Sequence, residues 1–157
     1  MMGIVMISEI LDKATNFITS VEGCKLEPYQ DSGGVWTCGV GFTYFQGKPV
    51  TESYPSNLTI EECHSELEKN VSEIYQDICS LVKVDLTDDQ YVSLCSFVYN
   101  IGIYAFEHST MLKLINENKL SSASEQFILW NHVNGVVCNG LTNRRRKEQS
   151  LFNGDNE

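Results

Sequence analysis

The sequence predicts an α+β protein of two lobes, in which one long helix joins a small antiparallel sheet to a bundle of helices. Short β-prone runs separated by glycines lie between Tyr29 and Val50. A capping box at Thr59 then begins an apolar pattern that keeps the helical period as far as Val82. Helical patterns with short connections occupy the remainder of the chain, which is typical of a compact bundle.

The length of 157 residues indicates one domain that can bury a core. A helix of about 23 residues would span roughly 35 Å, so we expect it to cross the domain and join the two lobes. The expected domain covers residues 1–157, with a sheet lobe at about 20–58, a connecting helix at 59–82, and a helical lobe at 83–157 packed with a helix over 8–22.

The first expected helix places a carboxyl group at its C-terminal end. Ser8 can act as its N-cap, and Gly23 follows as its stop signal. Glu22 is therefore the last residue of the helix, where the macrodipole disfavours an ionised carboxylate. A carboxyl group that keeps its proton is what a general acid requires. The apolar positions at helical spacing are Ile7, Ile10, Leu11, Ala14, Phe17, Ile18 and Val21.

The elements after Gly23 are predicted from turn and capping signals. Residues 35–38 and 42–45 read as strands of a sheet with two or three strands, and residues 51–57 read as a loop. A second capping box at Thr87 begins a helix that ends at Gly102. Three more helices are expected, which begin at Ser109 or Thr110, at Ser121 or Ser122 (reaching Trp130), and after Asn139-Gly140 (ending near Phe152).

Charge and ligand spacing exclude two classes of function. A net charge of −10 argues against non-specific binding of nucleic acid, which depends on Lys and Arg. His64, His108 and His132 lack metal-ligand spacing, and no cysteines form a C-x-x-C pair, so we expect neither a metal nor another cofactor. The basic cluster at residues 144–147 is interpreted as a solvated helix face rather than an anion site. It can also brace the helical lobe through Glu148 or bind a stem-peptide carboxylate.

The start of the chain and its cysteines bear on the compartment. Residues 4–7 form an apolar run that is too short to span a bilayer and lacks the positive charge of a signal peptide. We therefore expect synthesis in a cytoplasm, no membrane insertion, and a separate route of release. Six cysteines permit three disulfides, but this compartment favours small buried thiols at positions 24, 38, 63, 79, 95 and 138.

Two carboxyl groups lie in or beside the glycine-rich stretch. Asp31 follows Glu22 by nine residues, and Thr37 follows six residues later. Glycoside hydrolysis needs one acid to protonate the leaving oxygen and a second acid on the opposite side of the sugar. The spacing alone leaves open whether Asp31 acts as a nucleophile or as a base. An Asp before Ser-Gly-Gly is also typical of a simple turn.

The motifs around these residues resemble those of the phage-type lysozymes, the muramidases of glycoside hydrolase family 24 that tailed phages make as endolysins. The first half of the motif is Glu22-Gly23-x-x-Leu26-x-Pro28-Tyr29-x-Asp31, then Gly34-x-Trp36-Thr37-x-Gly39-x-Gly41. The second half agrees through Gln90, Leu94, Ser96-Phe97-Val98-Tyr99-Asn100-x-Gly102, Phe106, Ser109-Thr110 and Gly140-Leu141-x-x-Arg144-Arg145-x-x-Glu148.

The resemblance implies a phage-lysozyme-like two-lobed fold that holds a polysaccharide between its lobes. It implies hydrolysis of the β-1,4 bond between N-acetylmuramic acid and N-acetylglucosamine in bacterial peptidoglycan. Carried over by position, Glu22 is the general acid, while Asp31 and Thr37 hold and activate the attacking water of an inverting hydrolase. Candidate glycan contacts are Thr43, Tyr99, Asn100 and Ser109.

A lysozyme of this kind would act as a monomer in bacterial cell lysis, on the cell wall in the periplasm, after release by a holin or another secretion route. The same residues would also serve a secreted antibacterial effector or a defence lysozyme. The alternative from another class is a relative that binds peptidoglycan without cleaving it. The presence of Glu22, Asp31 and Thr37 argues against that alternative.

Some residues depart from the family pattern. Phe42 stands where the family usually has a His, and we expect this to change local packing rather than chemistry. Cys24 and Cys38 flank the catalytic positions, and oxidation of such a pair would constrain the cleft, although buried thiols are favoured here. Trp36 and Trp130 are interpreted as packing residues rather than sugar platforms.

Overall fold

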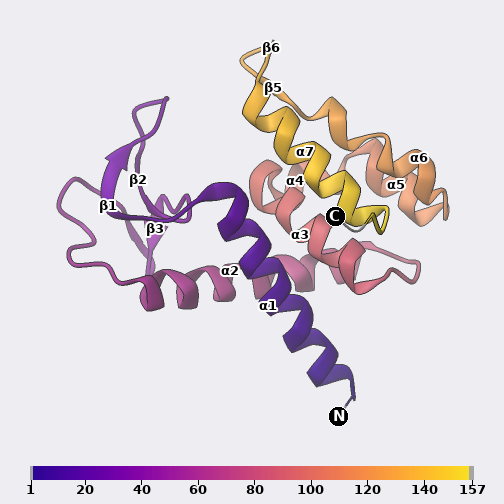
Figure 1. Ribbon diagram of the computed structural model, residues 1–157, viewed down its shortest axis with the longest axis horizontal. Coiled ribbons are helices and arrows are strands. Elements are labelled where there is room, and N and C mark those ends of the chain that lie inside the picture. Colours follow the sequence, from indigo (N-terminus) through magenta and orange to yellow (C-terminus); the bar gives the residue numbers. More distant parts are fainter. Residues whose placement is uncertain (1, 156–157) are drawn as a thin grey trace.

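The computed structural model describes residues 2–155, and the side chains of residues 7–155. Figure 1 shows the strands of the first half on one side of the molecule and helices α3 to α7 on the other, with α1 and α2 between them. The elements of the first half are α1 (Met2–Glu22), β1 (Lys25–Gln30), β2 (Trp36–Gly39), β3 (Tyr44–Phe45), β4 (Lys48–Pro49) and α2 (Ile60–Leu81).

Helix α1 is longer than the capping signal predicted. It begins at Met2, so Ser8 lies inside the helix and is not its N-cap. The apolar run at residues 4–7 continues the helical pattern on the N-terminal side of Ser8, which removes the need for a start there. The predicted C-terminal end at Glu22 is confirmed, and the Gly23 N–H donates to the Thr19 carbonyl at 2.8 Å.

Strands β1 to β4 form two separate two-stranded sheets instead of one small sheet. In the first sheet, β1 pairs antiparallel with β2, and it begins at Lys25, before the expected start near Tyr29. In this register Lys25 lies opposite Gly39, and Tyr29 lies opposite Thr37. In the second sheet, β3 and β4 form a hairpin.

The long connecting helix forms as predicted. Thr59 caps α2, and both hydrogen bonds of the capping box with Glu62 are present. The helix has 22 residues and extends from beneath the sheets to the helical side of the molecule (Figure 1). Its buried face consists of Cys63, Leu67, Val71 and Ile78.

The second half contains α3 (Asp88–Ile101), α4 (Ile103–Glu107), α5 (Thr110–Asn116), α6 (Leu120–Ser124), the 3₁₀ helix η1 (Phe127–Leu129), β5 (His132–Val133), β6 (Val136–Val137) and α7 (Asn139–Phe152). The capping box of α3 at Thr87, the Ser109 cap of α5 and the end of α7 at Phe152 agree with the predictions.

Two predictions for the second half are wrong. The helix expected from Ser121 or Ser122 to Trp130 is broken into α6, which already begins at Leu120, and η1. The buried Phe127 ring packs edge-on against Phe97 at 5.1 Å, a tertiary contact that holds a tighter turn there. Helix α4 and the β5–β6 hairpin were not predicted.

The core continues from the sheets into the helices through aromatic packing. Phe97 of α3 lies at its centre and meets Phe106 and Phe127 edge-on. Trp130 also contacts Phe97, at 5.7 Å, so its packing role is confirmed. Phe42 is buried against Phe45 at 6.3 Å, as expected of a change in packing at the position where the family usually has a His.

The cysteines divide into buried and exposed thiols, apart from Cys138, which is half-buried. All six are free, and Cys38, Cys63 and Cys95 are buried as predicted. Cys24 and Cys79 are exposed instead, because they lie on outward-facing positions at the start of β1 and near the end of α2. Separately, none of the helices within residues 2–155 combines the length and the apolar character needed to cross a bilayer.

Candidate active site

Glu22 occupies the point where α1 ends and the chain turns into the first sheet. Its side chain is 24% exposed, and its Oε2 accepts a hydrogen bond from Arg144 Nη1 at 2.5 Å. Gly23 follows with φ of +78°, a left-handed conformation that glycine adopts without cost. The other oxygen, Oε1, lies toward Gly41, where an added Cβ would stand 3.5 Å away. One carboxylate oxygen is thus held by a cation, and the other faces a backbone without a side chain.

Arg144 is a buried cation shared between two carboxylates. It is 7% exposed and donates from Nε to Glu148 Oε2 at 3.1 Å, in addition to its contact with Glu22. Its Nη2 donates to the backbone carbonyl of Ser96 at 2.9 Å. Ser96 Oγ in turn donates to Glu148 Oε2 at 2.6 Å.

Arg145 extends the same network toward the end of α3. Its Nη2 donates to Asn100 Oδ1 at 2.5 Å, its Nη1 lies 3.3 Å from Glu148 Oε1, and its guanidinium stacks over the Phe97 ring. Burial lowers the pKa of Arg145 to about 10, an effect that Glu148 opposes. Burial likewise raises the pKa of Glu148, and Arg145 opposes that shift most strongly.

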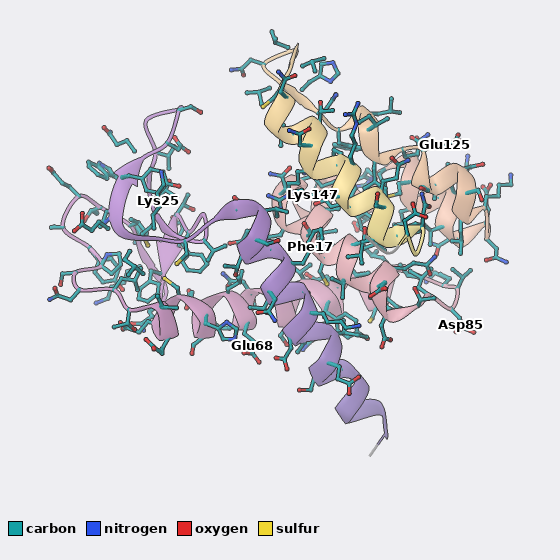
Figure 2. All side chains as sticks on the ribbon, in the orientation of Figure 1. Phe17, Lys25, Glu68, Asp85, Glu125 and Lys147 are labelled. Carbon is teal, nitrogen blue, oxygen red and sulfur yellow. The ribbon has the colours of Figure 1, made fainter. Side chains whose placement is uncertain are left out.

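The interpretation of residues 144–147 as a solvated face is therefore half correct. Arg144 and Arg145 are buried and brace the helical side through Glu148, as the second interpretation expected. Arg146 and Lys147 are exposed, and Lys147 lies beside Phe17 of α1 at the rim of a surface hollow (Figure 2). The four neighbouring residues differ in burial because consecutive residues of a helix point in different directions.

Asp31 and Thr37 are brought together by the peptide groups of one residue, Val35. Asp31 closes the loop between β1 and β2, where its Oδ1 accepts from the N–H groups of Gly33 at 2.8 Å and Val35 at 2.9 Å. Thr37 Oγ1 donates to the Val35 carbonyl at 2.9 Å. Thr37 is 4% exposed, whereas Asp31 is exposed. The loop thus holds an accessible carboxylate next to a sheltered hydroxyl.

Tyr29 connects the two carboxylates electrostatically. Its pKa is raised, first by burial and then by the negative charges of Glu22 and Asp31. A carboxylate changes the pKa of a phenol only when the two groups are near each other, so Tyr29 lies near both Glu22 and Asp31. The residue also faces Thr37 across the ladder. Sequence reasoning did not assign it a role, although it stands within the motif that contains Glu22 and Asp31.

A second tyrosine joins the sheet side to the helical side. The Tyr99 hydroxyl donates to the Val40 carbonyl. Burial and then Glu22 raise the pKa of Tyr99, while Arg144 lowers it. Glu22, Arg144 and Tyr99 therefore lie close together where the sheets meet the helices.

The four candidate glycan contacts have different surroundings. Thr43 and Asn100 are exposed, although Asn100 Oδ1 is already bonded to Arg145. Tyr99 is half-buried, with its hydroxyl bonded to Val40. Ser109 is buried, and its hydroxyl caps α5 by accepting from the Leu112 N–H at 3.1 Å and donating to the Phe106 carbonyl. Ser109 therefore has a structural task that accounts for its hydroxyl.

Among the side chains of residues 7–155, no three of the His, Cys, Asp and Glu types come together in a way that could hold an ion. The groups that meet at the site are carboxylates, hydroxyls and guanidinium groups. Such a set can donate a proton, position a water molecule and bind a polyol or an amide.

Known proteins share both the sequence and the fold. The family described as Phage lysozyme matches residues 19–148. The chain is 42% identical over 133 residues to the endolysin of Salmonella phage P22, covering 83% of this chain and 88% of the relative. It is 35% identical over 147 residues to the endolysin of Acyrthosiphon pisum secondary endosymbiont phage 1, covering 91% and 97%.

The structure is similar to that of the endolysin from Escherichia coli O157:H7 phage FAHEc1, with a TM-score of 0.82 and 35% identity, over 89% of this chain and 90% of that one. The match of the family spans most of the chain and includes Glu22, Asp31, Thr37 and Arg144. The helix-rich α+β fold predicted from the sequence agrees with these solved structures. The chain belongs to the phage lysozyme family and is a glycoside hydrolase of the endolysin type.

Proposed function

We propose that the protein is a muramidase that cleaves the β-1,4 bond between N-acetylmuramic acid and N-acetylglucosamine in peptidoglycan, with inversion. The observation that carries this proposal is that Glu22, paired with Arg144, and Asp31, bonded to the Val35 N–H, are both close enough to raise the pKa of Tyr29. Two carboxylates presented around one surface are the minimum set for glycoside hydrolysis. The two relatives described above are both endolysins, which supports an action on the bacterial cell wall.

Glu22 serves as the general acid in this proposal. Arg144 holds Oε2 and leaves Oε1, on the Gly41 side, to carry the proton. Gly41 has φ of +73° and no side chain, so the glycosidic oxygen can approach Oε1 without a steric block from that residue. When the proton has left, the guanidinium stabilises the resulting carboxylate, which favours proton transfer to the leaving group.

Asp31 and Thr37 position the attacking water. Both loop bonds of Asp31 end on Oδ1, so we assign Oδ2 as the base that takes a proton from water. Thr37 donates its own proton to Val35, and its lone pairs can accept the second hydrogen of the same water. A fixed acceptor pair of this kind holds one lone pair of the water toward the anomeric carbon.

The substrate contacts follow from exposure. We propose Thr43, Tyr99 and Asn100 as glycan contacts, since they lie on the sheet and helical sides of the same region. The enzyme would act as a monomer on the wall, made in a cytoplasm and released by a separate holin or secretion route. A role as a secreted effector or defence lysozyme would use the same chemistry.

Digestion of purified peptidoglycan tests the proposal. Borohydride reduction of the products, followed by hydrolysis and sugar analysis, identifies the newly formed reducing end, and we expect muramitol. NMR of the fresh products distinguishes the mechanism, and we expect the α-anomer at first. Glu22→Gln should bind peptidoglycan without releasing reducing ends. A new reducing end on N-acetylglucosamine, an initial β-anomer, or full activity of Glu22→Gln would each contradict part of the proposal.

A further inference from the structure

We propose that Cys24 and Cys63 are a disulfide-forming pair, which a low-molecular-weight disulfide oxidises to a crosslink between the start of β1 and helix α2. The proposal adds a covalent modification site to the enzyme and does not depend on the identity of its substrate. Six free thiols are present, and these two come from different elements of the sheet side.

Backbone pairing and the position of the Cys63 sulfur place both residues beside Gly39. Cys24 immediately precedes Lys25, which lies opposite Gly39 in the β1–β2 ladder (Lys25 is labelled in Figure 2). The Cys63 sulfur reaches the same place from α2, where it would lie 3.2 Å from a Cβ added to Gly39. A hydrogen bond with the Cys24 side chain is among the causes that raise the pKa of Cys63 to about 12, after burial.

The third thiol nearby, Cys38, is less suited to bond with Cys24. In the register that pairs Lys25 with Gly39, Cys24 and Cys38 are diagonal neighbours across the ladder. Diagonal residues stand about 7–8 Å apart, whereas disulfides bridge Cα atoms about 4.4–6.8 Å apart. Cys38 is also buried, and burial raises its pKa to about 11, so its thiolate is scarce at neutral pH.

The reaction has a clear order, because Cys24 is exposed whereas Cys63 is buried. Its thiolate attacks one sulfur of the small disulfide, and a mixed disulfide and one thiolate form. The Cys63 thiolate then attacks the Cys24 sulfur and expels the second small thiolate. The two protons that the cysteines lose are taken up by the two leaving thiolates, so two protein thiols are oxidised and one small disulfide is reduced.

The second step should be slow at neutral pH and faster at higher pH, because Cys63 must lose a proton first. The crosslink would close a loop over residues 24–63, which contains all four strands β1 to β4. Closing such a loop restricts the unfolded chain and stabilises the folded one. Gly23 lies between Cys24 and Glu22, and the space beside its Cα is open, since an added Cβ would meet no atom within 4 Å. The chain can therefore adjust at Gly23, and we expect the Glu22–Arg144 contact to persist in the oxidised protein.

The experiment incubates the purified protein with oxidised glutathione at pH 8.5 and maps the products by mass spectrometry without reduction. We expect a linked pair of peptides that contain Cys24 and Cys63, and a rise of about 5–15 °C in the unfolding temperature. Addition of a reducing agent should reverse both changes. Peptidoglycan cleavage is measured in parallel and should be retained, so loss of the proposed activity in the untreated protein would leave this test intact.

Two matched variants complete the test. Cys24→Ser removes the exposed partner and should abolish both the linked peptides and the rise in unfolding temperature. Cys79→Ser removes the other exposed thiol, on α2 and away from β1, and should leave both unchanged. A stable mixed disulfide on Cys24 without a Cys24–Cys63 crosslink would overturn the proposal. A crosslink of Cys24 to Cys38 would overturn it as well.

Discussion

Replacement of Arg144 by Met tests whether the buried cation holds the catalytic acid in place. Met preserves most of the aliphatic volume but removes every donor, including the contacts to Glu22 at 2.5 Å, to Glu148 at 3.1 Å and to the Ser96 carbonyl at 2.9 Å. Glu148 is fully buried and would keep only Ser96 and Arg145 as partners. Removing one partner of a buried ion pair costs about 3–5 kcal/mol.

Urea unfolding followed by circular dichroism measures this loss, and the same cost corresponds to a drop of about 6–20 °C in unfolding temperature. Lys147→Met is the matched control, because this exposed cation on the same helix should change stability by less than about 0.5 kcal/mol. A double-mutant cycle with Glu22→Gln isolates the contact between Glu22 and Arg144. Equal stability of Arg144→Met and Lys147→Met, or additive effects in the cycle, would refute the assignment of Arg144 as the residue that positions Glu22.

Three further predictions concern the water site, a helix cap and alkaline stability. Asp31→Asn and Thr37→Glu should each lower peptidoglycan turnover at least tenfold while substrate binding persists, and unchanged initial rates in both would remove these residues from the water step. Ser109→Ala should lower the free energy of unfolding by about 1 kcal/mol with unaltered glycan affinity, since its hydroxyl caps α5; weakened affinity in a pull-down would reverse this assignment. Burial raises the pKa of Cys95 from 9.0 to about 12, so the thiol ionises at lower pH in the unfolded chain, and the free energy of unfolding should fall as pH rises from about 9 to 12. Urea unfolding measures this fall between pH 8.5 and pH 10.5, and it should be smaller in Cys95→Ala by about 2 kcal/mol. An equal fall in both proteins would contradict the shift.

Local signals predicted much of the fold because the relevant interactions are themselves local. The capping boxes at Thr59 and Thr87 form with the hydrogen bonds that their sequence spacing requires. Gly23 and Gly102 end their helices for a similar reason, since each adopts a positive φ that few other residues tolerate. The same rules place Glu22 at the end of α1, as observed.

Long-range contacts explain what the sequence left out. The partner of Glu22 is Arg144, 122 positions later, and a run of four basic residues does not reveal which of them are buried. The break between α6 and η1 depends on the packing of Phe127 against Phe97, which has no local signature. The β5–β6 hairpin is a different case, because Asn134-Gly135 between Val133 and Val136 is a local turn signal for a hairpin.

The hydrogen bond from the Tyr99 hydroxyl to the Val40 carbonyl, which connects α3 to the sheet side, determines which substitutions these two positions can accept. The acceptor is a peptide carbonyl, so any residue at position 40 that fits the core can supply it, while the hydroxyl must come from position 99. At Gly41, an added Cβ would stand 3.5 Å from Glu22 Oε1, and the φ of +73° disfavours any residue with a side chain. A saturation scan that selects for lysis should therefore show a sharp asymmetry, with several aliphatic residues accepted at 40, almost nothing but Tyr at 99, and only Gly at 41.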